Sequence, residues 1–165
     1  MAGRTVSRFV NFAITNPTTL RDVPISSVSV CGVVYEEQDM TAFQDAVRGA
    51  LPNMPDAPIE VSGPFDTTAV TEAAGSGATK TLSGSHPAIS PLVGAMTPIT
   101  LDVQFGMRQD YTDGDPQFGI SADTGAVNGY ICSAYNVNLD DMTYTAKFVL
   151  YPGSTLPAWG VAVET

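Results

Sequence analysis

The feature that most constrains this fold is a series of short segments in which apolar and polar residues alternate. The clearest is Ile99–Met107, in which every second residue is apolar. Strict alternation places the apolar side chains on one face of a strand, where a core can bury them. The 15 glycines and 12 prolines separate these segments as turn residues do. The pattern predicts a mainly β protein.

About seven or eight strands are predicted, and they indicate a β-sandwich or β-barrel. The turns between them include Thr15–Thr19, Asp113-Gly114 as a hairpin tip, and Pro152–Ser154. The predicted strands are Thr5–Ile14, Pro24–Tyr35, Ile59–Phe65, Ile99–Met107, Phe118–Ser121, Gly129–Val137, Met142–Tyr151 and Trp159–Val163.

One flanking α-helix is predicted, over Thr41–Leu51. Thr41 and Gln44 fit a capping box, in which the threonine hydroxyl accepts a free backbone N–H at the start of the helix. An apolar stripe follows at helical spacing, and Pro52 cannot continue the helix. The stripe consists of Phe43, Val47, Ala50 and Leu51. We expect it to pack against the sheet.

The length of the chain predicts a single domain over residues 1–165. Residues 66–98 include a run of small residues and are interpreted as a long connection, with one helical turn around Ala88–Val93. We expect a flexible N-terminal arm and a long loop over about residues 71–98. This loop is expected to become ordered against a neighbouring subunit.

The charge of the chain excludes several classes of protein. Its 17 Asp and Glu against 7 Lys and Arg give a formal net charge of -10, which argues against a surface that grips nucleic acid. No run approaches the ~18 consecutive apolar residues of a membrane span. Asn11, Thr15 and Asn16 interrupt the apolar stretch that a signal peptide would need. With only 15% charged residues, the surface suits a protein that is covered by copies of itself.

The residues that could carry chemistry form no specific pattern. His86 is the single histidine, and a triad built from it with Ser83 or Ser85 has no specificity. A zinc site needs about four Cys or His ligands, which is more than the one histidine and two cysteines of this chain. The two cysteines, Cys31 and Cys132, lie in apolar, strand-like runs and are interpreted as buried thiols, with a disulfide as the alternative. We predict no catalytic, cofactor-binding or metal-ligating residue and no enzymatic activity.

Two acidic clusters and one glycine-rich segment have simpler explanations. The carboxylates of Asp110–Asp115 do not have the spacing of a calcium loop, so this segment is interpreted as a solvated turn. Glu36 and Glu37 are adjacent, and on a strand they point to opposite faces, unlike a glycosidase pair. Gly75–Gly77 neither follows a strand nor opens a helix, as a phosphate-binding loop would.

The order of these parts resembles that of the tail tube (major tail) proteins of long-tailed bacteriophages. Those proteins carry an early Asp-x-Thr before a helix, a strand with Gly-x-Phe or Gly-x-Trp, and a late pair of antiparallel strands. The corresponding parts here are Val33–Thr41, the helix to Leu51, Ile59–Thr68, Ile99–Gly106, Tyr130–Asn136, Met142–Leu150 and Pro157–Gly160. The resemblance covers most of the chain from about Val30 onward.

The resemblance implies a β-sandwich or barrel subunit with a helix at its side. Six copies would join their sheets into a ring, and rings would stack into a hollow tube through which DNA passes without specific binding. Other virion proteins would be further partners, and no membrane would be involved. The protein would be made in the host cytoplasm and end in the virion tail. The alternatives are a head decoration or neck protein of a virion and a soluble ligand-binding β-domain.

The charge is expected to matter in such a tube. A lumen lined by acidic groups would repel phosphate, so that DNA slides without sticking. We expect many of the 17 carboxylates to face a water-filled channel or the tube exterior. The alternative is that acidity only keeps the free subunit soluble.

Overall fold

A computed structural model describes residues 10–16, 19–42, 49–68, 81–82, 84–105, 116–120 and 129–161. Within them the chain is mainly β, as predicted, and includes one short α-helix and one 3-10 helix. The elements are β1 (Val10–Asn16), β2 (Thr19–Val23), β3 (Ser27–Val30), β4 (Val34–Asp39), β5 (Ala50–Asp56), β6 (Ile59–Pro64), β7 (Thr81–Leu82), α1 (Ser85–Ile89), η2 (Ser90–Leu92), β8 (Thr100–Phe105), β9 (Pro116–Gly119), β10 (Tyr130–Asn138), β11 (Thr143–Leu150) and β12 (Ala158–Val161).

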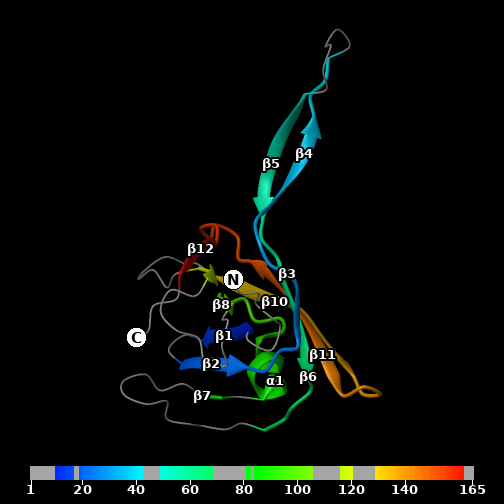
Figure 1. Cartoon of the computed structure of the whole chain (residues 1–165), viewed down its shortest axis with the longest axis vertical. Helices are drawn as coiled ribbons and strands as arrows, with labels where there is room; N and C mark the ends of the chain where they lie inside the picture. The colour runs from blue at the N-terminus through cyan, green and yellow to red at the C-terminus, as the bar shows by residue number, and fades with distance from the viewer. Residues whose placement is uncertain are drawn as a thin grey trace, which may run out of the picture.

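The strands form three sheets (Figure 1). A six-stranded sheet has the order β12-β9-β8-β1-β2-β7, and a four-stranded sheet has the order β10-β11-β6-β3. The third sheet contains only β4 and β5. The two larger sheets stay separate and do not close on themselves, so the fold is a β-sandwich, and the barrel alternative is not adopted.

The core lies between the two larger sheets. Phe12 on β1 and Phe148 on β11 meet across it, with ring centroids 5.7 Å apart, and both are fully buried. Residues of β6 alternate between buried and half-buried, as expected for a strand with one face toward a core. The other large, fully buried side chains are Tyr130, Tyr144, Phe118, Ile14, Ile59, Ile89, Leu101 and Val103.

The helical segment α1–η2 closes one part of this core. Ala88, Ile89 and Leu92 are buried in it. Ser85 is also buried, and its hydroxyl donates to the carbonyl oxygen of Pro64 at 2.8 Å. The helical turn expected around residues 88–93 is therefore present, a few residues earlier. Within the expected long loop, Thr81–Leu82 form β7 and Ser85–Leu92 pack on the sandwich, whereas Val93 and Met96 are 45% and 67% exposed. Residues 71–80 and 83 of this loop, and residues 1–9 at the N-terminus, where a flexible arm was expected, lie outside the described residues.

The predicted helix over Thr41–Leu51 is wrong at both of its ends. Ala50 and Leu51 belong to β5, and Leu51 pairs with Gln38 of β4. The hydroxyl of Thr41, expected to cap a helix, instead accepts the N–H of Gly49 at 3.0 Å across the hairpin. Residues 43–48, which include the stripe residues Phe43 and Val47, lie outside the described residues.

The physical reason is that helical spacing alone does not supply a surface to pack against. Most helix stability in proteins comes from burying an apolar face. Leu51 is 55% exposed, so no core receives the stripe at this end. Cross-strand hydrogen bonds close the hairpin instead, including one from the N–H of Met40 to the carbonyl oxygen of Gly49 at 2.9 Å.

The other strand predictions are largely confirmed, with different boundaries. The segment predicted at 99–107 contains β8, the segment at 129–137 contains most of β10, and the segment at 142–151 contains all of β11. The segment predicted as one strand at 24–35 is divided, because β3 ends at Val30 and β4 begins at Val34. Strands β2, β5 and β7 were not predicted.

Candidate assembly surfaces

His86 lies on α1 within a row of aromatic rings. Its ring centroid is 5.3 Å from that of Phe65 and 5.8 Å from that of Tyr135. Its Nδ1 is 3.2 Å from the Tyr135 hydroxyl. The neighbouring Ser85 uses its hydroxyl on two backbone groups at the end of β6 and just after it. Both side chains thus attach α1 to the sandwich, and they are not paired as nucleophile and base.

The other residues considered for chemistry are either exposed or outside the described part of the chain. Glu36 and Glu37 are adjacent and exposed on β4. Asp110–Asp115, Gly75–Gly77 and Ser83 lie outside the described residues. Within the described ranges, no group of three or more His, Cys, Asp or Glu side chains is arranged to hold a metal ion. No described helix has the length and apolar character needed to cross a membrane.

Cys31 and Cys132 are free thiols in this structure. Cys132 on β10 is buried, and Cys31, directly after β3, is half-buried. Burial raises the pKa of each thiol to about 11. Both thiols are therefore protonated at neutral pH and are weak nucleophiles, because the thiolate is the reactive form.

The surface that stands out is the β4–β5 hairpin, which projects away from the two packed sheets (Figure 1). Its two strands pair with each other and form a sheet of their own. Every residue of β4 is exposed, and so is every residue of β5 except the half-buried Pro55. An isolated two-stranded hairpin is at best marginally stable in water. This hairpin is therefore expected to be stabilised by a partner.

The hairpin exposes large hydrophobic side chains along its length. Met54 is 84% exposed, and four others are between 50% and 55% exposed. These four are Val34, Tyr35, Met40 and Leu51. Contiguous exposed apolar surface on a folded protein marks an interaction site. The same segment is acidic, since its described residues include Glu36, Glu37, Asp39 and Asp56 and no lysine or arginine.

The hairpin continues the β3–β6 strand pair after a short break. The β3–β6 ladder ends at Val30, and the β4–β5 ladder begins at Val34. Gly32, between them, has a φ of 148°, which glycine adopts readily because it lacks a Cβ. On the other strand of the pair, Ala57, between β5 and β6, is fully buried and holds the root of the hairpin against the sandwich. The strand pair leaves the sandwich at this break.

The outer strand β12 presents a second exposed surface. It lies at one edge of the six-stranded sheet and pairs on its inner side with β9. Trp159 on this strand is 58% exposed. Its ring centroid lies 4.9 Å from that of Phe118 and 5.6 Å from that of Phe105, which holds the indole against the sheet. The open side of an edge strand has unpaired backbone groups that can pair with another chain.

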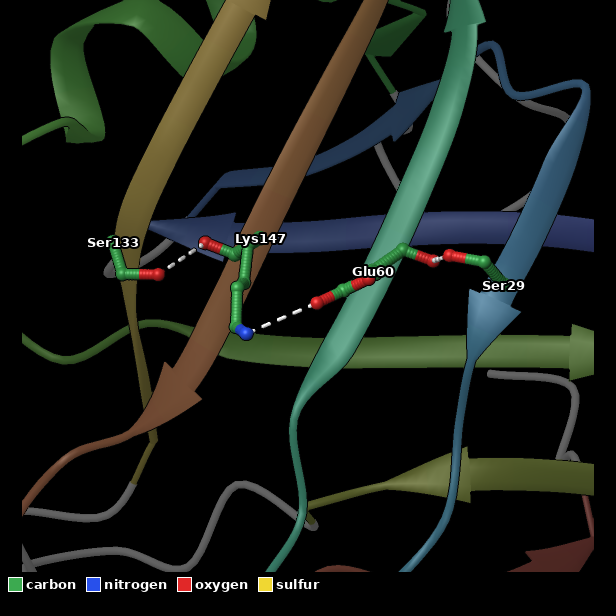
Figure 2. A network of polar contacts seen from close by, with 4 residues as sticks. All are labelled: Ser29, Glu60, Ser133 and Lys147. Atoms are coloured by element: carbon green, nitrogen blue, oxygen red, sulfur yellow. Dashed lines mark hydrogen bonds and ion pairs between the residues drawn. The ribbon is translucent and has the colours of Figure 1, made fainter.

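The solvent face of the four-stranded sheet carries a polar row that crosses all of its strands (Figure 2). Lys147 on β11 forms an ion pair with Glu60 on β6, with Nζ 3.0 Å from Oε1. The hydroxyl of Ser133 on β10 donates to the Lys147 carbonyl at 3.1 Å, and that of Ser29 on β3 donates to the Glu60 carbonyl at 3.3 Å. Lys147 is thus neutralised within this face, which therefore offers phosphate little net positive charge.

Sequence reasoning missed the β4–β5 hairpin as a functional element. The signal that could have found it is Pro52 and Pro55, which are three positions apart and pair across the hairpin with Glu37 and Tyr35 of the acidic strand β4. Prolines at such positions are typical of an edge strand rather than of a helix end alone. The edge strand β12 was predicted, over Trp159–Val163, but its exposed tryptophan could not be recognised as exposed from the sequence.

Comparison with solved structures shows a likeness of fold. No family model and no curated protein sequence matches the chain. Its fold is similar to that of a chain in the cryo-EM structure of the anti-feeding prophage (AFP) baseplate, 6-fold symmetrised. The two chains superpose with a TM-score of 0.55 at 9% sequence identity, and the match covers 97% of each.

Proposed function

We propose that the chain is a structural, non-enzymatic virion protein of a phage-type tail. Its copies would close into six-membered rings, and the rings would stack into a hollow tube through which DNA passes. Subunits would accumulate in the host cytoplasm and end in the tail of the virion. Other virion proteins would meet the ends of the tube.

The observation that carries this proposal is the β4–β5 hairpin. A protein that acts as a monomer gains nothing from an exposed strand pair with a row of apolar side chains, which costs solubility and invites aggregation. A subunit of an assembly buries this surface against a neighbour. A contact between the hairpin of one copy and the body of the next copy joins two different surfaces. Such head-to-tail contacts generate rings or filaments.

The fold and the open sheet edges support the same proposal. The similar chain comes from the 6-fold symmetrised structure of a prophage baseplate, and a ring of six copies would have the same symmetry. Edge strands at both sides of the sandwich provide backbone groups through which sheets of neighbouring copies can join. The order of parts in the sequence independently resembles that of tail tube proteins.

The charge of the chain agrees with a conduit for DNA. The net charge of -10 disfavours binding to phosphates. In addition, Lys147 on the solvent face of the four-stranded sheet is already paired with Glu60. DNA in the tube would therefore be confined without being held.

The test is concentration-dependent assembly of the purified chain, followed by analytical ultracentrifugation and electron microscopy. Rings of six copies and stacked tubes with a lumen are expected. A variant with Val34→Ser, Leu51→Ser and Met54→Ser should stay largely unassembled, because it removes three of the five large exposed hydrophobic side chains of the hairpin without touching the core. The matched control is Leu139→Ser, since Leu139 is 70% exposed in the turn between β10 and β11.

Two results would refute the proposal. The first is a chain that stays monomeric at every concentration and salt condition. The second is a hairpin variant that assembles as readily as the Leu139→Ser control. Tight, salt-sensitive binding of duplex DNA by the tubes would refute the conduit role, because it would need a basic lining.

A further inference from the structure

The four edge strands of the two larger sheets differ in how available they are to another chain. β7 has only two residues. The first part of β10 is already bridged by Val93 and Ile99, which lie beside Cys132 and Tyr130. On β3 the exposed serine hydroxyls bond back to β6. The edge strand β12 has none of these restrictions among the described contacts.

Chemically, β12 is suited to a close apolar contact. Residues 148–163 contain no charged side chain, in a chain with a net charge of -10. Ala158 and Gly160 are small and exposed, so another backbone can approach them closely. Between them stands Trp159, with more than half of its surface in contact with solvent. A large, preorganised aromatic side chain of this kind is typical of residues that dominate interface energy.

The two edges of the β4–β5 hairpin are also unequal. β5 contains Pro52 and Pro55, which have no N–H to donate, so its outer edge is a poor template for a further strand. β4 contains no proline, and among the described strands it pairs only with β5, on its inner side. It also carries Val34 and Tyr35, each about half exposed.

We propose that strand β4 of one copy adds to the open edge of β12 of another copy, and that the hairpin's apolar side chains then cover Trp159. This inference rests on the proposed function, because the occupant is a second copy of the chain. β12 and its neighbour β9 carry no charged side chain, so the carboxylates of Glu36 and Glu37 meet no like charge on these two strands. Each copy gives one hairpin and receives one, so the contact propagates from copy to copy.

The first test uses the single tryptophan of the chain as a reporter. On assembly of the full-length protein, the emission of Trp159 should shift to the blue, and quenching by acrylamide should weaken severalfold. The hairpin variant with Val34→Ser, Leu51→Ser and Met54→Ser should keep the emission and quenching of the free subunit at the same concentration. Assembled rings or tubes in which Trp159 is quenched as readily as in the free subunit would overturn the inference and leave the proposed function standing.

The second test compares opposite charges at one exposed position of β12. Ala158→Glu should raise the concentration needed for assembly by about tenfold or more, because a carboxylate would then face those of β4. Ala158→Lys should leave it unchanged or lower it. Combining Ala158→Glu with Glu37→Lys should restore assembly. Leu139→Glu and Leu139→Lys are the matched controls on a surface that is not involved, and circular dichroism checks that each variant is folded.

The results separate the two ideas. If Ala158→Glu and Ala158→Lys have equal effects while the wild type assembles, β12 does not receive the acidic hairpin, and only this inference fails. The wild type could form oligomers but no tube, with Ala158→Glu weakening the association and Ala158→Lys not weakening it. In that case the inference holds and the tube proposal fails. If the wild type never associates, both fail.

Discussion

Two buried tyrosines that differ in their hydrogen bonds provide a sharp test of the packing. Tyr144 on β11 and Tyr130 on β10 are both fully buried. The Tyr144 hydroxyl donates to the carbonyl oxygen of Pro24 at 3.0 Å. The Tyr130 hydroxyl is buried and has no hydrogen-bond partner among the described residues. Replacing each tyrosine by phenylalanine keeps the ring and removes only the hydroxyl.

The two substitutions should change stability in opposite directions. Tyr144→Phe removes one hydrogen bond and should lower the free energy of unfolding by about 1–2 kcal/mol. Tyr130→Phe removes a buried polar group without a partner, whose desolvation costs about 1–3 kcal/mol, so stability should be unchanged or higher by about 1 kcal/mol. The difference of about 1–3 kcal/mol between the variants corresponds to roughly 2–12 °C in Tm for a domain of this size.

The assay is urea denaturation of the dilute, unassembled subunit, followed by circular dichroism. The slope of the free energy against urea should be the same for both variants and the wild type, because neither changes the surface exposed on unfolding. The reasoning is refuted if Tyr130→Phe is as destabilising as Tyr144→Phe. That result would mean that the Tyr130 hydroxyl makes a hydrogen bond in the folded protein.

Three further predictions concern the core, the thiols and one turn. Phe148→Ala, which removes the contact with Phe12 on the opposite sheet, should lower the free energy of unfolding by about 3–5 kcal/mol. Leu51→Ala on the exposed hairpin should change the free energy of unfolding of the unassembled chain by less than about 0.5 kcal/mol. Comparable losses for the two variants in urea denaturation would contradict this assignment of core and hairpin. Burial raises the pKa of the Cys31 and Cys132 thiols from 9.0 to about 11, so the folded state keeps these protons at a pH at which the unfolded state releases them, and their contribution to stability is present below pH 9 and is lost as the pH rises through 11. Replacing Cys31 by Ser and Cys132 by Ala should therefore flatten the fall of the free energy of unfolding between pH 9 and 11, and an unchanged slope would count against this reasoning. Met142 has a φ of 50°, a backbone conformation that costs a residue with a Cβ about 1–2 kcal/mol. Met142→Gly should therefore raise the free energy of unfolding by about 0.5–1 kcal/mol, after the entropy cost of glycine is subtracted, while Met142→Ala should not. A loss of stability on Met142→Gly would show that the methionine side chain has a packing role.

Alternation determined much of the sandwich from the sequence. Ile99–Met107 and Met142–Tyr151 were predicted as strands because a period of two leaves one apolar face that must be buried. The structure buries Leu101, Val103 and Phe148 on those faces. The order of turns and strands was also sufficient to predict a mainly β chain, and the helical turn expected around residues 88–93 is present as α1 and η2.

Over residues 41–51, spacing at i, i+4 and i+7 predicted a helix, and this prediction was wrong at both ends of the segment. Periodicity reports which residues share a face, but it does not report whether a surface exists to receive that face. Here β4 and β5 project away from the sandwich, and Leu51 on β5 is 55% exposed. Of the apolar residues that suggested a helix face, Ala50 and Leu51 are exposed on β5 and are available to a partner.

The same limit applies to the candidate assembly surfaces. Composition indicated an acidic protein with little charge, suited to contact with copies of itself, but it located no contact. Trp159 was recognised as a strand residue, and only the sheet order showed that its strand lies at an open edge with the indole exposed. Exposure and edge position depend on which strands become neighbours, and that is decided by contacts between residues far apart in the chain. The sequence by itself determined the local alternation of strands, and the tertiary structure decided which of their faces and edges were left for another molecule.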